Sequence, residues 1–203
     1  MDFLALSEHC APMVHPRTMA AIVRVESGFN PYAIGVVAGR LVRQPTDRAE
    51  AVATAKSLEQ QGYNFSVGVG QVNRYNLARY GLDYESAFDA CLNLGAGASI
   101  LSECFARATK VLKSEQGALR AALSCYYSGN FTTGFREGYV ARVVGENDRR
   151  PLPLAIPLAS PPSSPRATTA GGRTGHRTSV QAQPAASTLG EPAPSEARSA
   201  LLF

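Results

Sequence analysis

Aromatic side chains are almost absent from the C-terminal part of the sequence. Phe203 is the only aromatic in residues 151–203, although these 53 residues hold 9 of the chain's 13 prolines. A segment rich in Pro, Ala and Ser cannot bury enough apolar surface to offset the entropy lost on ordering it. We therefore expect one folded domain over residues 1–150 and a disordered, flexible tail over 151–203. This division excludes a two-domain enzyme, a collagen-like chain and a coiled coil.

The chain also lacks a dense cluster of basic residues. It has 20 Lys and Arg against 16 Asp and Glu, and the net charge of +4 is shared evenly by the two parts. This weak charge argues against a nucleic-acid partner. No apolar run approaches the roughly 20 residues of a membrane span. Residues 1–8 lack the basic and long apolar segments of a signal peptide. We expect neither a transmembrane span nor a visible export signal.

Metal-ligand spacing is missing as well. The four cysteines show no C-x-x-C pair, and the three histidines are not arranged for zinc. We therefore expect no metal and no cofactor. Four cysteines allow three disulfide pairings, and four separate buried thiols explain the composition equally well.

Helical patterns dominate residues 1–150. Pro16 suits the first position of a helix that Gly28 would end. Further helices are expected over residues 45–61, 76–80, 85–88, 92–112, 117–127 and 135–144, and the apolar 117–127 helix should be central and buried. Short strands are expected over 34–37, 40–42 and 65–69. Helices around one small three-stranded antiparallel sheet make an α+β domain that is predominantly α.

Glu26 is the acidic residue that stands out on physical grounds. It falls in the last turn of an apolar helix, where the helix dipole disfavours a negative charge. Val25 and Phe29 flank it, and Arg24 should face elsewhere on the helix. Desolvation and the dipole both favour the protonated carboxyl that a general acid needs. On these features alone, a solvated glutamate at a helix end is the commoner outcome.

Four motifs in order favour a catalytic role instead. They are Val-Glu-Ser-Gly-Phe-Asn-Pro at 25–31, Gly-Val-Gly-Gln-Val-Asn at 68–73, Asn-Leu-Gly-Ala-Gly at 93–97 and Leu-Ser-Cys-Tyr-Tyr-Ser-Gly-Asn at 123–130. They resemble motifs of the lytic transglycosylases with a lysozyme-like fold. Each motif alone is weak, but four in order across residues 8–145 are specific.

The resemblance implies a fold, a reaction and a set of site residues. Family members cleave the β-1,4 bond between N-acetylmuramic acid and N-acetylglucosamine in peptidoglycan. One carboxyl protonates the glycosidic oxygen and then takes the proton of the C6 hydroxyl, which closes a 1,6-anhydro ring. The substrate's acetamido group removes the need for a second carboxylate. By resemblance the catalytic residue is Glu26, and the substrate-binding residues are Ser27, Gln71, Asn73 and Tyr126.

Several of these assignments have alternatives. Ser27 would orient Glu26 or simply end its helix, and Asn73 would line the groove or cap the next helix. Tyr127 stands where many relatives have Asn, so no polar contact is assigned to it. Gly70 replaces a bulkier residue common in the family, which would open the floor of the groove.

One branch of the family is most similar to this chain. Residues 30–36, 43–45 and 87–91 resemble the transglycosylases attached to type IV secretion systems. That branch implies other secretion components as partners and the periplasm as location. Its members tend to have cysteines at the places of Cys10 and Cys91. A Cys10–Cys91 disulfide is therefore expected in an oxidising compartment, with Cys104 and Cys125 as buried thiols.

Two other functions compete with this reading. A hydrolase of the goose-lysozyme kind would need a second carboxylate, for which Asp83, Glu85 and Asp89 are the candidates. A non-catalytic peptidoglycan-binding scaffold of the secretion system would need no acid, and the intact signature around Glu26 argues against it.

Overall fold

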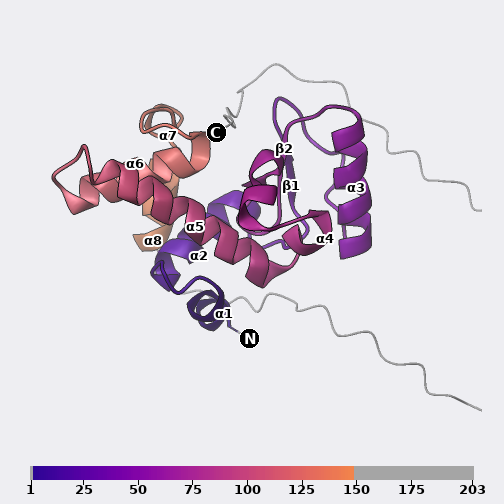
Figure 1. Ribbon diagram of the computed structural model, residues 1–203, viewed down its shortest axis with the longest axis horizontal. Coiled ribbons are helices and arrows are strands. Elements are labelled where there is room, and N and C mark those ends of the chain that lie inside the picture. The colour runs from indigo at the N-terminus through magenta and orange to yellow at the C-terminus, as the bar shows by residue number, and fades with distance from the viewer. Residues whose placement is uncertain (1, 149–203) are drawn as a thin grey trace, which may run out of the picture.

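Helices predominate in the computed structural model, which describes residues 2–148 (Figure 1). The α-helices are α1 (Phe3–Cys10), α2 (Pro16–Ser27), α3 (Arg48–Gln60), α4 (Tyr84–Ala87), α5 (Ala90–Ala108), α6 (Glu115–Ser128), α7 (Thr133–Arg136) and α8 (Tyr139–Asp148). Two 3₁₀ turns are η1 (Arg74–Asn76) and η2 (Ala78–Tyr80), and the strands are β1 (Ile34–Val36), β2 (Phe65–Val67) and β3 (Val72–Asn73). The expected α+β class with helical majority is confirmed. The expected tail over 151–203 lies outside the described residues.

The ends of α2 follow from local sequence. Pro16 occupies the first turn, and His15 Nδ1 accepts a hydrogen bond from the Arg17 N–H at 3.2 Å. At the other end Gly28 is in the left-handed region, with φ of 59°, and its N–H donates to the Arg24 carbonyl. The predicted Pro16-to-Gly28 helix is therefore confirmed, and its last turn carries Glu26.

The sheet has three antiparallel strands in the order β1-β2-β3. Ile34 pairs with Val67, and Ser66 pairs with Asn73. The strand predicted over residues 40–42 is wrong, because the third strand is β3. Val42 is 74% exposed, so its side chain is not packed against the core as a strand residue would be. Val72 of β3, in contrast, is 1% exposed.

Two helical features also differ from the expectation. The segment 3–10 forms α1, which was not expected, and its Phe3 packs edge-on against Phe29 of the loop after α2. The helix predicted over 135–144 is two helices, α7 and α8. Gly138 separates them at φ of 71°, a left-handed conformation that ends α7.

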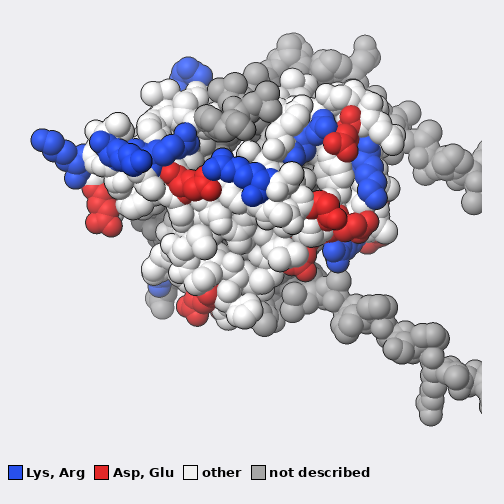
Figure 2. Space-filling model, viewed as in Figure 1, with Lys and Arg blue, Asp and Glu red and all other residues white. Residues whose placement is uncertain are grey.

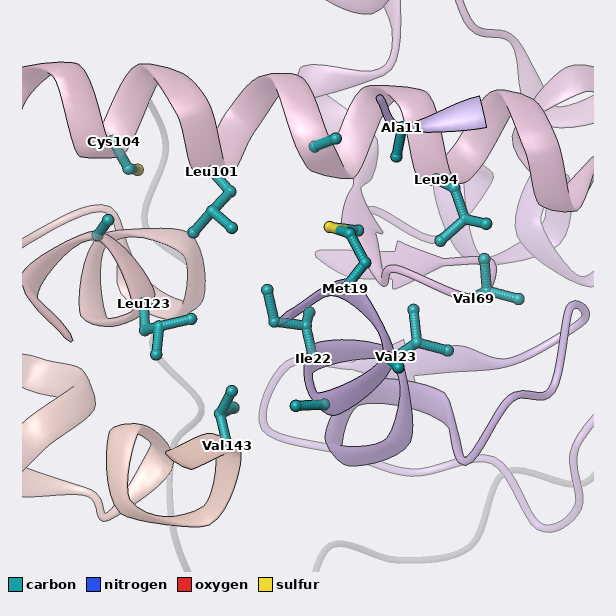
Figure 3. Close-up of a cluster of buried hydrophobic side chains, with 14 of the residues drawn as sticks. Ala11, Met19, Ile22, Val23, Val69, Leu94, Leu101, Cys104, Leu123 and Val143 are labelled. Carbon is teal, nitrogen blue, oxygen red and sulfur yellow. The ribbon is translucent and has the colours of Figure 1, made fainter. Parts of the chain in front are cut away.

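Two large hydrophobic clusters and a small third one (Ala108, Ala118 and Ala121) form the core of the described residues, and α5 contributes to all three. The first joins α1, α2, α5, α6 and α8, and Figure 3 shows Met19 and Ile22 of α2 pointing toward Leu101 of α5. The second lies between the sheet, α3 and α4. Figure 1 shows α5 passing between the two parts of the fold. Within the described residues, no helix combines the length and the apolar character that a membrane crossing requires.

Candidate active site

A groove lies between the helical part and the sheet. Its helical wall contains Glu26 at the end of α2 and Tyr126, Tyr127, Ser128 and Gly129 at the end of α6. Its sheet wall contains Gly35, Val36, Val37, Ser66, Gln71, Val72 and Asn73. Its far end contains Asn76, Arg79, Tyr80, Ile100, Glu103, Cys104, Arg107 and Cys125. The groove thus brings together four of the predicted site residues, all except Ser27.

Glu26 lies half-buried in the helical wall. Its sequence neighbour Arg24 faces away, as expected: the guanidinium pairs with Glu146 at 3.4 Å and lies 4.9 Å from the centre of the Phe29 ring. Arg24 is therefore occupied outside the groove and does not neutralise Glu26.

Two buried phenols accompany the Glu26 carboxylate. Burial, and then the negative charge of Glu26, raise the pKa of Tyr126 well above its ordinary value. The same two causes raise the pKa of Tyr139, with a smaller contribution from hydrogen bonding to Glu26. The Tyr139 hydroxyl has no well-aligned hydrogen-bond partner in the described part of the chain. Its interaction with Glu26 is therefore close and electrostatic rather than a fully formed hydrogen bond, and both phenols stay protonated at neutral pH.

Tyr126 also holds the loop of residues 68–71. Its hydroxyl donates to the Gly70 carbonyl at 2.5 Å. The Gly70 N–H donates to Oδ1 of Asn93 at 2.7 Å, and Asn93 Nδ2 donates to the Val67 and Ala87 carbonyls at 3.0 and 2.8 Å. Asn93 is fully buried, so its amide fixes this loop against the start of α5.

Gly70 does not open the floor of the groove. A Cβ at this position would lie 3.1 Å from the Tyr126 hydroxyl and 3.2 Å from Asn93 Oδ1. The missing side chain therefore makes room for these two polar groups behind the loop. The expectation of a wider groove is corrected accordingly.

Gln71 lines the groove in a strained backbone conformation. Its φ of 51° lies in the left-handed region, which non-glycine residues adopt only where the surroundings impose it. Its side-chain Nε2 donates to the Ala33 and Gly68 carbonyls at 3.0 and 2.9 Å. Both amide N–H groups are used in this way, so a ligand can use only the Oε1 acceptor.

Asn73 combines both roles that the sequence suggested. It lines the groove, and its Oδ1 accepts from the Tyr75 N–H at 3.1 Å, which caps η1. Its Nδ2 donates to Asn64 Oδ1 at 2.8 Å. Ser27, in contrast, does not line the groove. Its Oγ lies 2.8 Å from the Val69 carbonyl and 3.1 Å from that of Val23, so it connects α2 to the 68–71 loop.

The three candidates for a hydrolase's second carboxylate, Asp83, Glu85 and Asp89, lie outside the groove. Asp83 caps α4, and hydrogen bonds from Ser86 lower its pKa. Asp89 caps α5, and Glu85 lies 3.9 Å from Lys56. The groove's other carboxylate is Glu103, which accepts from Arg79 at 2.6 Å and from the Tyr80 hydroxyl at 3.2 Å. In the described residues, no group of three or more His, Cys, Asp or Glu could hold a metal ion.

Residues 3–147 match the family model of the transglycosylase SLT domain. The chain belongs to this family. It is therefore a lytic transglycosylase, as the four motifs predicted.

This lytic transglycosylase has relatives with a shared name. It is 59% identical over 162 residues to "Type IV secretion system protein virB1" of Brucella suis biovar 1 (strain 1330), covering 77% of this chain and 68% of the relative. It is 34% identical over 142 residues to "Protein virB1" of Agrobacterium tumefaciens (strain 15955), covering 70% of this chain and 59% of the relative. No solved structure matches the chain significantly.

The cysteines of the transglycosylase form two pairs. Cys10 is bonded to Cys91, with 5.1 Å between the Cα atoms, which is the pairing that the resemblance implies. Cys104 and Cys125 are bonded as well, at 5.8 Å, so the expectation of two separate thiols is wrong. The close packing of α5 against α6 brings these two Cα atoms within disulfide range. The second pair lines the far end of the groove.

Sequence reasoning missed three tyrosine contacts in the transglycosylase site. Tyr127 donates to Glu137 Oε2 at 2.8 Å, and its ring stacks on that of Tyr139 with 4.6 Å between the centroids. The stack supports the phenol beside Glu26. No local pattern identified Tyr139, because its contact with Glu26 depends on how α8 packs across α2. The only sequence signal for Tyr139 is that it lies within the helix expected over residues 135–144.

Proposed function

We propose that this transglycosylase cleaves the β-1,4 bond between N-acetylmuramic acid and N-acetylglucosamine in peptidoglycan and leaves a 1,6-anhydro end. The observation that carries this proposal is the unequal state of the two groove carboxylates. Glu103 is engaged by Arg79 and Tyr80, whereas the charge of Glu26 in the helical wall acts on two protonated phenols, Tyr126 and Tyr139. A mechanism with one catalytic carboxyl suits this arrangement.

The reaction would have two steps. In the first, the Glu26 carboxyl gives its proton to the glycosidic oxygen, and the acetamido oxygen of the muramic acid attacks C1 as the N-acetylglucosamine leaves. In the second, the Glu26 carboxylate takes the proton of the C6 hydroxyl. The C6 oxygen then attacks C1 and displaces the acetamido oxygen, which regenerates the protonated acid. No water enters the product.

The surrounding residues would divide the remaining tasks. The Tyr139 hydroxyl is a protonated donor near Glu26, so it can stabilise the carboxylate between the two steps, whereas the single O–H of Tyr126 is donated to the Gly70 carbonyl. Gln71 would accept a hydrogen bond from the glycan through Oε1, and Asn73 would lie along the same wall. Ser27 would act indirectly, by holding the 68–71 loop against α2.

The biological setting is part of the proposal. Similarity to proteins named for type IV secretion systems supports local opening of the cell wall for assembly of such a system, with other secretion components as partners. Two disulfides suit an oxidising compartment, which supports the periplasm. We further propose that residues 1–150 form the catalytic unit and that 151–203 are separate from it.

The experiment is product analysis of digested peptidoglycan by mass spectrometry, with Glu26→Gln as the matched inactive control. We expect anhydro ends, each lighter by one water than a reducing end. Reducing ends in the wild-type digest would identify a hydrolase and overturn the proposed reaction. No products from a folded wild-type protein would favour the scaffold instead.

A further inference from the structure

The groove contains two separate charged regions. At the helical wall, the charge of Glu26 acts on Tyr126 and Tyr139. At the far end, Arg79 and Tyr80 of η2 meet Glu103 and Arg107 of α5. We call these last four residues the basic end, since two guanidinium groups accompany one carboxylate.

The four residues of the basic end interact as a unit. Arg79 and the Tyr80 hydroxyl both donate to the Glu103 carboxylate, at 2.6 and 3.2 Å. Burial raises the pKa of Tyr80 first and the charge of Glu103 adds to it, while the charges of Arg79 and Arg107 oppose that rise. Arg107 therefore lies close enough to act on the same phenol. The positive charges of Arg79 and Arg107 therefore both act at the Tyr80 hydroxyl.

Arg107 is held in position by its own surroundings. Its Nη2 lies against the Cys104–Cys125 disulfide, 3.6 Å from the sulfur of Cys104. The guanidinium also lies 5.9 Å from the centre of the Phe131 ring. A guanidinium placed by a disulfide and an aromatic ring is preorganised, so binding an anion costs less side-chain entropy.

Several cations also gather on one face of the molecule. Figure 2 shows Lys and Arg side chains in a band across this face, from the joined ends of α5 and α6 toward the α3 side. The band contains carboxylates at only a few points. The band adds positive charge to this face of the molecule, with carboxylates interspersed.

We propose that the basic end binds carboxylates of the peptide stems that peptidoglycan carries. This inference rests on the proposed function, because it names the part of the substrate that enters the far end of the groove. The sugar chain itself is uncharged once the lactyl group is joined to a peptide. The ionised groups are the carboxylates and amines of the peptides. The basic end attracts such carboxylates, so its charge favours strands that place a peptide stem at the far end of the groove.

The guanidinium geometry suits this ligand. A carboxylate accepts two parallel N–H bonds from one guanidinium, and such charge-assisted pairs are stronger than neutral hydrogen bonds. If a substrate carboxylate replaced Glu103 as the partner of Arg79, the Arg79 guanidinium would still be paired with one negative charge. Both arginines lie at exposed positions, so the binding should weaken as salt increases.

The test compares two substrates that differ only in charge. One is soluble peptidoglycan strands with their peptides, and the other is the same strands after conversion of the peptide carboxylates to carboxamides. For the wild type we expect a KM about fivefold higher on the amidated strands, with kcat little changed. Arg79→Gln and Arg107→Gln should raise KM about as much on the carboxylate strands and leave KM unchanged on the amidated strands.

Three further variants complete the experiment. Arg120→Gln removes an exposed charge of α6 outside the groove and should behave as the wild type. Arg107→Lys should retain most of the discrimination, because it keeps the positive charge. Glu103→Gln should lower KM on carboxylate strands, because it removes the competing acid. If Arg107→Gln does not fold, Arg79→Gln tests the proposal alone.

The outcomes separate the two proposals. Equal wild-type KM values on both substrates, or an equal rise on both in the arginine variants, overturn the peptide-stem inference and leave the transglycosylase reaction intact. Failure of the folded wild type to cleave either substrate contradicts the proposed function itself.

Discussion

The two walls of the groove are built in different ways. The helical wall consists of residues at the ends of α2 and α6, and α8 packs on both helices with its Tyr139 only 1% exposed. The sheet wall consists of residues from the three short strands and from the loop before β3, in which Gln71 has φ of 51°. Side chains held by helix packing can present an acid with buried partners, whereas a loop presents hydrogen-bonding groups along a ligand. We therefore expect the helical wall to determine kcat and the sheet wall to determine KM.

The strongest test of the helical wall's role compares its carboxylate, Glu26, with Glu103 at the far end of the groove. Glu26→Gln keeps the shape of the side chain but removes the transferable proton, so we expect kcat to fall about 100-fold or more. Glu103→Gln removes a carboxylate that is bonded to Arg79 and Tyr80, and kcat should stay within about twofold. Glycan-strand cleavage assays measure both. A Glu103→Gln variant as inactive as Glu26→Gln would contradict the one-carboxylate mechanism.

Tyr139→Phe tests the interior of the helical wall. Loss of a hydroxyl that stabilises the Glu26 carboxylate should lower kcat about tenfold with KM unchanged. The free energy of unfolding should not fall, because this buried hydroxyl has no well-aligned partner within the described residues. A loss of stability without a loss of rate would show that the phenol only packs.

The stability of the Tyr139→Phe variant should also depend on alkaline pH differently from that of the wild type. The pKa of Tyr139 is raised above the ordinary value of 10.0, so the unfolded chain releases this proton before the folded chain does. The free energy of unfolding therefore falls as pH rises above about 10. Denaturant titrations at several alkaline pH values should show a shallower fall for Tyr139→Phe than for the wild type.

Gln71→Ala tests the sheet wall. The variant loses the Oε1 acceptor that faces the groove, and we expect KM to rise about fivefold with kcat changed less than twofold. It also loses two bonds to backbone carbonyls, so the free energy of unfolding should fall by about 1–2 kcal/mol. A fall in kcat alone would show that the loop positions Glu26 rather than the glycan.

The helical wall was also the easier wall to predict from sequence. Pro16 and Gly28 are local signals, and they placed Glu26 in the last turn of α2 before any tertiary contact was known. For the sheet wall, the sequence analysis predicted β1 and β2 but placed the third strand at residues 40–42 instead of Val72–Asn73. Strand β3 has only two residues, and its existence depends on pairing with Ser66 and Val67 of β2. Such pairing leaves almost no local pattern.

Local sequence patterns could not predict contacts between helices that are far apart in the sequence. Tyr139 meets Glu26 because α8 packs on α2, and Cys104 meets Cys125 because α5 packs on α6. Composition left the cysteine pairings open. The family motifs supplied Gln71, Asn73 and Tyr126, which the groove brings together with Glu26, but they could not show that Ser27 faces the 68–71 loop.

The two disulfides provide a smaller comparison across the molecule. Replacement of Cys10 and Cys91 together by Ser should lower the free energy of unfolding by about 3 kcal/mol and leave cleavage unchanged, because neither lines the groove. The matched double replacement of Cys104 and Cys125 should lower stability similarly and also reduce cleavage about twofold, since this pair supports Arg107. Non-reducing peptide mapping checks both pairings. Free thiols in the oxidised protein would contradict them.

The smallest effect is expected from truncation after Arg150. Both walls of the groove, both disulfides and the family match at residues 3–147 precede this point. The remaining segment is rich in Pro, Ala and Ser, a composition that does not support a second packed core. We therefore expect kcat, KM and the thermal midpoint of the truncated protein to match those of the full chain. A fall in kcat would mean that residues 151–203 contribute to the helical wall's chemistry, and a rise in KM would mean that they help bind the glycan.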